Sequence, residues 1–70
     1  MSAEMEFFIY LLVHYAENKN STADKVLAQW DAAGITDTIY SMYQQYHSEA
    51  IENAFDDIDS MLQEATAESK

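Results

Sequence analysis

The sequence predicts an all-α protein, built as a small bundle of three to four helices. The 70-residue chain contains no Pro and a single Gly, so few residues interrupt helices. Its clearest pattern lies near the end, where Ile51, Phe55, Ile58 and Leu62 recur at the spacing of an amphipathic helix. We expect helices at about residues 3–18, 22–33, 37–47 and 49–64, in a single domain of residues 1–70 whose last residues, 65–70, fray.

The first predicted helix begins after Ser2, with Glu4 and Glu6 in its first turns. Two neighbouring apolar stripes cover more than half of its circumference, and a 70-residue monomer has too little core to bury both. The helix is therefore either the centre of the bundle or a self-association surface. We favour the second interpretation, a homodimer. Its seam is assigned to Phe8, Leu12 and Tyr15, and the neighbouring stripe consists of Met5, Ile9, Val13 and Ala16.

The second predicted helix opens at Ser21 or Thr22, where Ser21 and Asp24 resemble a capping box. It ends at Gly34, which has the position of a left-handed C-cap. Trp30 is interpreted as a core anchor whose indole N–H needs an acceptor if it is buried. The third helix starts at Thr36.

The boundary between the third and fourth predicted helices contains neither Gly nor Pro. Ser48 is the expected N-cap of the fourth helix. A single continuous helix over both segments is the alternative.

The fourth helix also has an acidic face, formed by Glu52, Asp56 and Asp59 at i, i+4 and i+7 with Asp57 beside them. No Lys or Arg lies within reach along this helix. Each like-charge pair at i,i+4 costs about 0.2–0.5 kcal/mol. We therefore expect these carboxylates to remain in water, ready for a positively charged partner.

The net charge of −10 arises from 13 acidic residues against 3 Lys and Arg, and it disfavours binding to phosphate backbones or anionic membranes. The natural complement is a protein with a basic surface, although acidity alone can serve solubility. The absence of Cys excludes disulfides and thiolate zinc sites. The apolar run 7–13 is far shorter than the ~20 residues of a membrane span and lacks the flanks of a secretory signal, so we expect a cytoplasmic protein.

Motifs for catalysis, metals and DNA are weak. The helices around Gly34 have the outline of a helix-turn-helix, but residues 36–47 contain no Lys or Arg, which argues against DNA binding. The acidic segment 56–59 lies on a predicted helix rather than in a calcium-binding loop. His14 and His47 stand alone on different helices. We expect no enzyme, metal or cofactor, and keep metal or small-ligand binding as a third hypothesis.

The chain contains, in this order, Glu6, Phe7, Ser21, Val26, Ile39, Tyr43, His47, Ser48, Asp57, Ile58 and Asp59. In this order they resemble a family of short bacterial proteins known as the domain of unknown function 3791, and the resemblance covers about residues 4–62. It implies no established activity, but family members are often encoded near toxins similar to ADP-ribosyltransferases, which implies an antitoxin-like or accessory role.

These observations favour a small acidic protein-interaction module that contacts a basic partner surface. The alternative is a nucleic-acid mimic, in which the four carboxylates of the acidic face replace phosphates on a basic nucleic-acid-binding protein. The candidate partner-binding residues are Tyr43, His47, Glu52, Asp56, Asp57 and Asp59.

Overall fold

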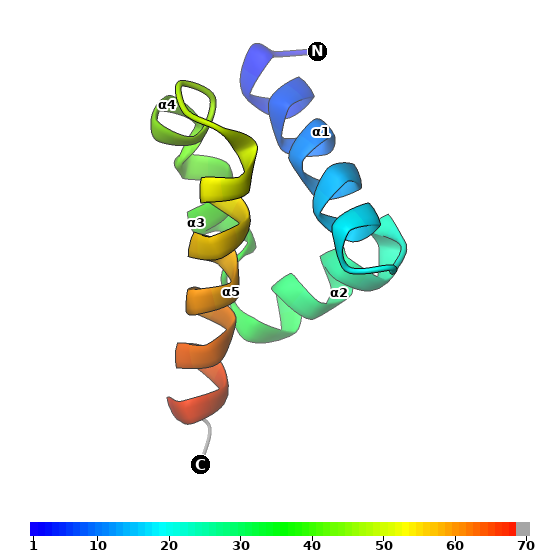
Figure 1. Cartoon of the computed structure of the whole chain (residues 1–70), viewed down its shortest axis with the longest axis vertical. Helices are drawn as coiled ribbons and strands as arrows, with labels where there is room; N and C mark the ends of the chain where they lie inside the picture. Colours follow the sequence, from blue (N-terminus) through cyan, green and yellow to red (C-terminus); the bar gives the residue numbers. More distant parts are fainter. Residues whose placement is uncertain (69–70) are drawn as a thin grey trace.

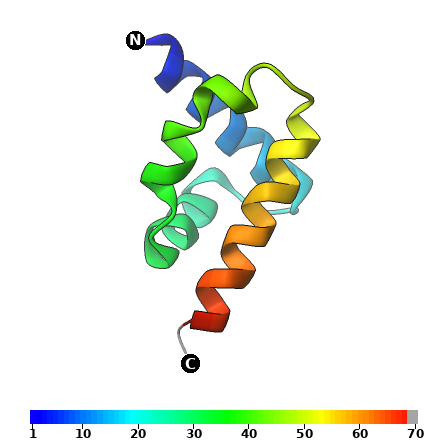
Figure 2. The ribbon, with the colours of Figure 1, turned by 90° about the vertical axis from the view of Figure 1, so that its left-hand side faces the viewer.

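The computed structural model describes residues 1–68 and confirms the all-α class, with no strand in that range. The long helices α1 and α5 stand on two sides of the molecule, and α2 crosses between the C-terminal end of α1 and the start of α3 (Figure 1). The last turns of α5 extend past the other helices in both views (Figures 1 and 2). The elements are α1 (Ala3–Asn18), α2 (Ala23–Ala33), α3 (Thr36–Ser41), α4 (Tyr43–Tyr46) and α5 (Ile51–Glu68).

The start of α1 and the end of α2 confirm the predicted caps. The Met5 N–H donates to Ser2 Oγ at 3.1 Å, which satisfies one of the unpaired amides of the first turn. Gly34 adopts a left-handed φ of 72° at the C-cap of α2, a conformation that glycine reaches at little cost. Beyond this turn, the Thr36 hydroxyl donates to Asp31 at 2.5 Å and ties α3 to the end of α2.

The capping box predicted at Ser21 is wrong, because Thr22 precedes α2 and makes no side-chain cap. The hydroxyl of Thr22 instead forms a hydrogen bond with Asp24, which lowers the pKa of that carboxyl. Asp24 nevertheless lies in the first turn of α2, where a carboxylate suits the positive end of the helix dipole.

The helix predicted at 37–47 is interrupted at Met42, which separates α3 from α4. The Met42 N–H donates to the Ile39 carbonyl and the Gln45 N–H to the Met42 carbonyl, both at 3.1 Å. These i→i−3 bonds tighten the backbone as in a 3₁₀ turn.

The third and fourth predicted helices are not continuous, since residues 47–50 lie between α4 and α5. Ser48 is not the cap of the last helix: its hydroxyl donates back to the carbonyls of Gln44 and Gln45 at 3.1 and 2.9 Å, satisfying the end of α4. The last helix starts at Ile51 and continues to Glu68, so the end predicted near residue 64 is wrong. Residues 69–70 of the expected tail lie outside the described residues.

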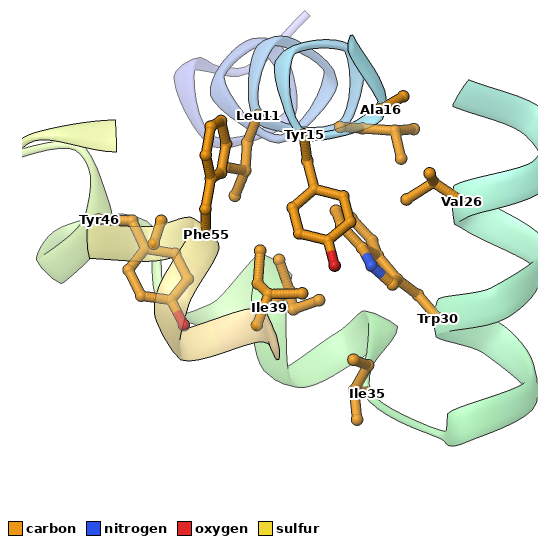
Figure 3. Close-up of a cluster of buried hydrophobic side chains, with 12 residues drawn as sticks. Leu11, Tyr15, Ala16, Val26, Trp30, Ile35, Ile39, Tyr46 and Phe55 are labelled. Carbon is orange, nitrogen blue, oxygen red and sulfur yellow. The ribbon is translucent and has the colours of Figure 1, made fainter. Parts of the chain in front are cut away.

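The core is centred on Trp30, which is fully buried and confirms its interpretation as an anchor. The rings of Phe8 and Tyr15 meet it edge-on, with centroids at 5.9 and 5.5 Å. The expected acceptor for its indole nitrogen is absent among residues 1–68. Helices α1 to α5 all contribute to this cluster (Figure 3). Its members are Leu11, Leu12, Tyr15, Ala16, Val26, Trp30, Ile35, Ile39, Tyr46, Ala54, Phe55 and Ile58.

Candidate protein-interaction surface

Two of the four carboxylates on the acidic face of α5 are used inside the molecule. Asp59 accepts hydrogen bonds from the Tyr15 hydroxyl at 2.7 Å and from Lys19 Nζ at 2.8 Å. Asp57 accepts a hydrogen bond from the Tyr46 hydroxyl. The expectation that all four carboxylates remain in water is therefore wrong for Asp57 and Asp59. Their donors lie on α1, directly after it and on α4, so the sequence of α5 alone could not reveal these contacts.

These contacts shift the pKa values of Tyr15, Tyr46 and Asp59. Burial raises the pKa of Tyr15, and the hydrogen bond to Asp59 raises it further. Burial and the bond to Asp57 raise the pKa of Tyr46 in the same way. Burial also opposes the charge of Asp59, but the hydrogen bonds from Lys19 and Tyr15 outweigh it, so its pKa lies below the usual value. Both phenols thus stay neutral donors at physiological pH.

Asp57 and Asp59 lie on opposite sides of Ile58, which is fully buried. One carboxylate reaches a phenol on α4 and the other reaches a phenol on α1. The acidic residues that contribute to the family resemblance therefore orient α5 within the bundle. Glu52 and Asp56 differ, since both are exposed, and they form the outward part of the acidic face.

The dimer seam assigned to Phe8, Leu12 and Tyr15 is wrong. Leu12 is 7% exposed and Tyr15 is 2% exposed, while Phe8 is half-buried against Trp30. The stripe that contains these three side chains packs against α2, α3 and α5. In the neighbouring stripe Ala16 is buried as well, but the other three residues are left at the surface. We call Met5, Ile9 and Val13 the α1 strip; they are 38%, 42% and 41% exposed.

Tyr43 and His47, both predicted site residues, stack in parallel with centroids 4.2 Å apart and planes 3° apart. The Phe7 ring of α1 meets them edge-on, at 5.7 Å from Tyr43 and 6.4 Å from His47. His47 Nδ1 also lies 2.5 Å from the Tyr43 carbonyl oxygen. Packing and a hydrogen bond therefore hold His47, which is exposed, in one orientation.

On α1, Tyr10 and His14 continue this group, with ring centroids 4.1 Å apart and Phe7 6.3 Å from Tyr10. We call these five side chains the aromatic cluster. The signal for the α1 members was present in the sequence, since they stand at i, i+3 and i+7, the spacing also seen at positions 40, 43 and 47. The cluster consists of Phe7, Tyr10, His14, Tyr43 and His47.

Metal and membrane sites find no support in the described part of the chain. Within residues 1–68, no three side chains of His, Cys, Asp or Glu gather in a way that could hold a metal ion. The same residues contain no helix that combines the length and hydropathy needed for a membrane span. His14 lies 3.5 Å from Glu17 on its own helix, and His47 belongs to the aromatic cluster.

Comparison with known proteins identifies the family and nothing beyond it. No curated protein and no solved structure shows significant similarity to the chain. Residues 6–65 match a family described as protein of unknown function (DUF3791). This match covers most of the chain and includes the aromatic cluster and the acidic face of α5. The chain therefore belongs to the DUF3791 family.

Proposed function

We propose that this chain is a small acidic protein-interaction module of the cytoplasm, which binds a partner protein with a basic surface. Its role is antitoxin-like, or accessory to a toxin resembling an ADP-ribosyltransferase. The single observation that carries the proposal is the aromatic cluster. Its stacked Tyr43 and His47 are held against α1 at the surface of a protein whose net charge is −10.

Exposed and partly exposed aromatic rings beside an excess of carboxylates suit the recognition of Lys and Arg. Arg stacks on aromatic faces, and cation–π contacts contribute about 0.5–2 kcal/mol depending on desolvation. Glu52 and Asp56 are exposed, so they can attract a basic partner at long range and increase its association rate. We therefore assign the contact area to the aromatic cluster and the electrostatic attraction of the partner to Glu52 and Asp56.

The nucleic-acid-mimic alternative receives less support. A mimic needs carboxylates spaced like phosphates across an exposed surface. Asp57 and Asp59 accept intramolecular hydrogen bonds from Tyr46, Tyr15 and Lys19, which reduces the outward carboxylates of this face to Glu52 and Asp56. Two carboxylates one helical turn apart make a poor imitation of a phosphate backbone.

The test is affinity capture from source cells with the tagged wild-type chain and three variants. We expect His47→Ala and Tyr43→Ala to lose the captured protein, since each removes a member of the stacked pair. The matched control is Gln44→Ala, which changes an exposed residue of the same helix and should retain the partner. Circular dichroism of each variant checks that the helices are intact.

The identity and charge of the captured protein supply the second readout. A partner with a basic surface, released by moderate NaCl, supports the proposal. If His47→Ala and Tyr43→Ala capture the same protein as the wild type, or if only acidic proteins are captured, the proposal is wrong.

A further inference from the structure

The exposed apolar side chains of this protein are concentrated on one helix. Within residues 1–68, the large hydrophobic residues that are most exposed belong to α1 or precede it, with a single exception on α3; α5 contributes none. Contiguous exposed apolar surface on a soluble protein marks an interaction site more often than chance exposure does. These residues are Met1, Met5, Ile9, Tyr10, Val13 and Tyr40.

The narrow shape of the α1 strip suits the binding of a single partner helix rather than of a broad protein surface. Met5, Ile9 and Val13 stand at i, i+4 and i+8, so they form a narrow ridge about 12 Å long at 1.5 Å per residue. A stable dimer of globular faces buries about 800 Å² on each partner, far more than one ridge provides. A single amphipathic helix laid along the ridge needs only a few anchors at this spacing.

The charges beside the α1 strip determine the chemistry of the helix that fits it. Glu6, Tyr10 and Glu17 stand at i, i+4 and i+11 and border the strip along one side. All three are exposed. Helix α1 contains no Lys or Arg, and Lys19 directly after it is paired with Asp59. The border is thus anionic and aromatic, and α1 has no Lys or Arg to attract an acidic partner.

We propose that the α1 strip binds one amphipathic helix of the partner, whose apolar side packs on Met5, Ile9 and Val13 and whose Lys or Arg residues meet Glu6, Tyr10 and Glu17. This inference rests on the proposed function and specifies which part of the partner is bound, namely an amphipathic helix. A second copy of the chain is a poor occupant, since it would bring the same carboxylates and another ten negative charges to the strip.

The probe is a fluorescein-labelled synthetic peptide of about 15 residues, in which Leu recurs at helical spacing and Lys fills the other positions. Fluorescence anisotropy measures its binding to the full chain. We expect the double variant Ile9→Gln, Val13→Gln to weaken binding about tenfold or more, because it removes two of the three apolar anchors. The double variant Glu6→Gln, Glu17→Gln should weaken binding less and reduce its dependence on NaCl.

Matched controls distinguish peptide binding at the α1 strip from non-specific attraction of the basic peptide to an acidic protein. Ala28→Gln with Ala32→Gln makes the same kind of double change at i,i+4 on exposed positions of α2 and should leave binding unchanged. Asp37→Asn with Glu64→Gln removes two charges from exposed positions of α3 and α5 and should also leave peptide affinity nearly unchanged at physiological NaCl. A scrambled peptide of the same composition should bind at least about tenfold more weakly.

Three outcomes overturn the inference: equal binding by the α1 double variant, equal binding of the scrambled peptide, or a dimer that Ile9→Gln with Val13→Gln dissociates in analytical ultracentrifugation. The capture experiment distinguishes the two proposals. A basic partner lost with His47→Ala but retained with Ile9→Gln and Val13→Gln would leave the proposed function standing and remove the helix-binding role of α1. If His47→Ala still captures the partner and the peptide still binds at α1, the proposed function is wrong and the helix-binding role of α1 stands.

Discussion

Helices α1 and α5 are the two longest in the protein, and they use their surplus residues in opposite ways. Helix α1 has more apolar side chains than the core can accept, and it leaves Met5, Ile9 and Val13 at the surface. Helix α5 has many carboxylates and no Lys or Arg of its own to pair with them. Asp57 and Asp59 accept hydrogen bonds from tyrosines of α4 and α1 instead. The comparison teaches that the neighbours of a helix decide which of its residues face outward.

The largest expected effect comes from placing the same charge on the two apolar stripes of α1. Leu12→Glu buries an unpaired carboxylate at a position that is 7% exposed, and we expect it to destabilise the protein by about 3 kcal/mol or more. Ile9→Glu makes the same chemical change at a position that is 42% exposed and should cost no more than about 0.5 kcal/mol. Urea unfolding followed by circular dichroism measures both.

If Ile9→Glu is as damaging as Leu12→Glu, the α1 strip is covered in solution, and the contrast between the two stripes fails. Sedimentation of the wild-type chain then shows whether a second copy provides the cover.

A smaller effect on stability is expected when Ala replaces a carboxylate of α5 that accepts intramolecular hydrogen bonds, Asp59, or one that is exposed, Asp56. Asp59→Ala leaves the Tyr15 hydroxyl, on a residue that is 2% exposed, without its acceptor, which costs about 1–3 kcal/mol. The ion pair with Lys19 adds little, since both side chains are more than a third exposed. Asp56→Ala, on an exposed residue, should be neutral or slightly stabilising, because Ala favours helices more than Asp does.

The pH dependence of this difference has a defined sign. The folded pKa of Asp59 lies below the usual aspartate value of 3.8, so ionised Asp59 contributes stability above that value. This contribution is lost as the pH falls through the folded pKa. We therefore expect the difference in unfolding free energy between wild type and Asp59→Ala to shrink on acidification below about pH 4. A constant difference down to pH 2 would mean that the Tyr15 contact does not depend on the charge of Asp59.

The sequence could predict the inward face of α5 but not that of α1. Helix α5 has one apolar stripe, so Phe55 and Ile58 had only one side on which to be buried, and both are buried. Helix α1 has two, and periodicity alone gives no reason to prefer the stripe of Leu12 over that of Ile9. The choice depends on where α2 and α3 pack, which is a property of the assembled bundle.

The same limit applies to the candidate site. Tyr43 and His47 could be recognised from their i,i+4 spacing on one helix, and the structure does stack them. The hydrogen bond between Tyr15 and Asp59 spans 44 positions of the chain, and no local pattern pairs those two residues. A carboxylate that appears unbalanced along its own helix can therefore be balanced from another helix.

The smallest expected effect concerns the carboxylates of α5 that do remain outside. Asp56 lies one turn after Glu52, and both are exposed, so Asp56→Asn should stabilise the protein by about 0.2–0.5 kcal/mol by removing a like-charge i,i+4 pair. Asn and Asp have similar helix propensities, so backbone preference does not obscure the change. The gain should disappear at high NaCl, where exposed charges are screened.

Glu52→Gln removes the same repulsion but lies in the first turn of α5, where a carboxylate gains about 0.3–1 kcal/mol from the helix dipole. We therefore expect Glu52→Gln to give no gain, and urea unfolding at low and high NaCl measures both variants. Equal stabilisation by the two substitutions would show that the repulsion dominates over the dipole. A loss of stability with Asp56→Asn would mean that Asp56, like Asp57 and Asp59, has an intramolecular partner, and the division of α5 into inward and outward carboxylates would then be wrong.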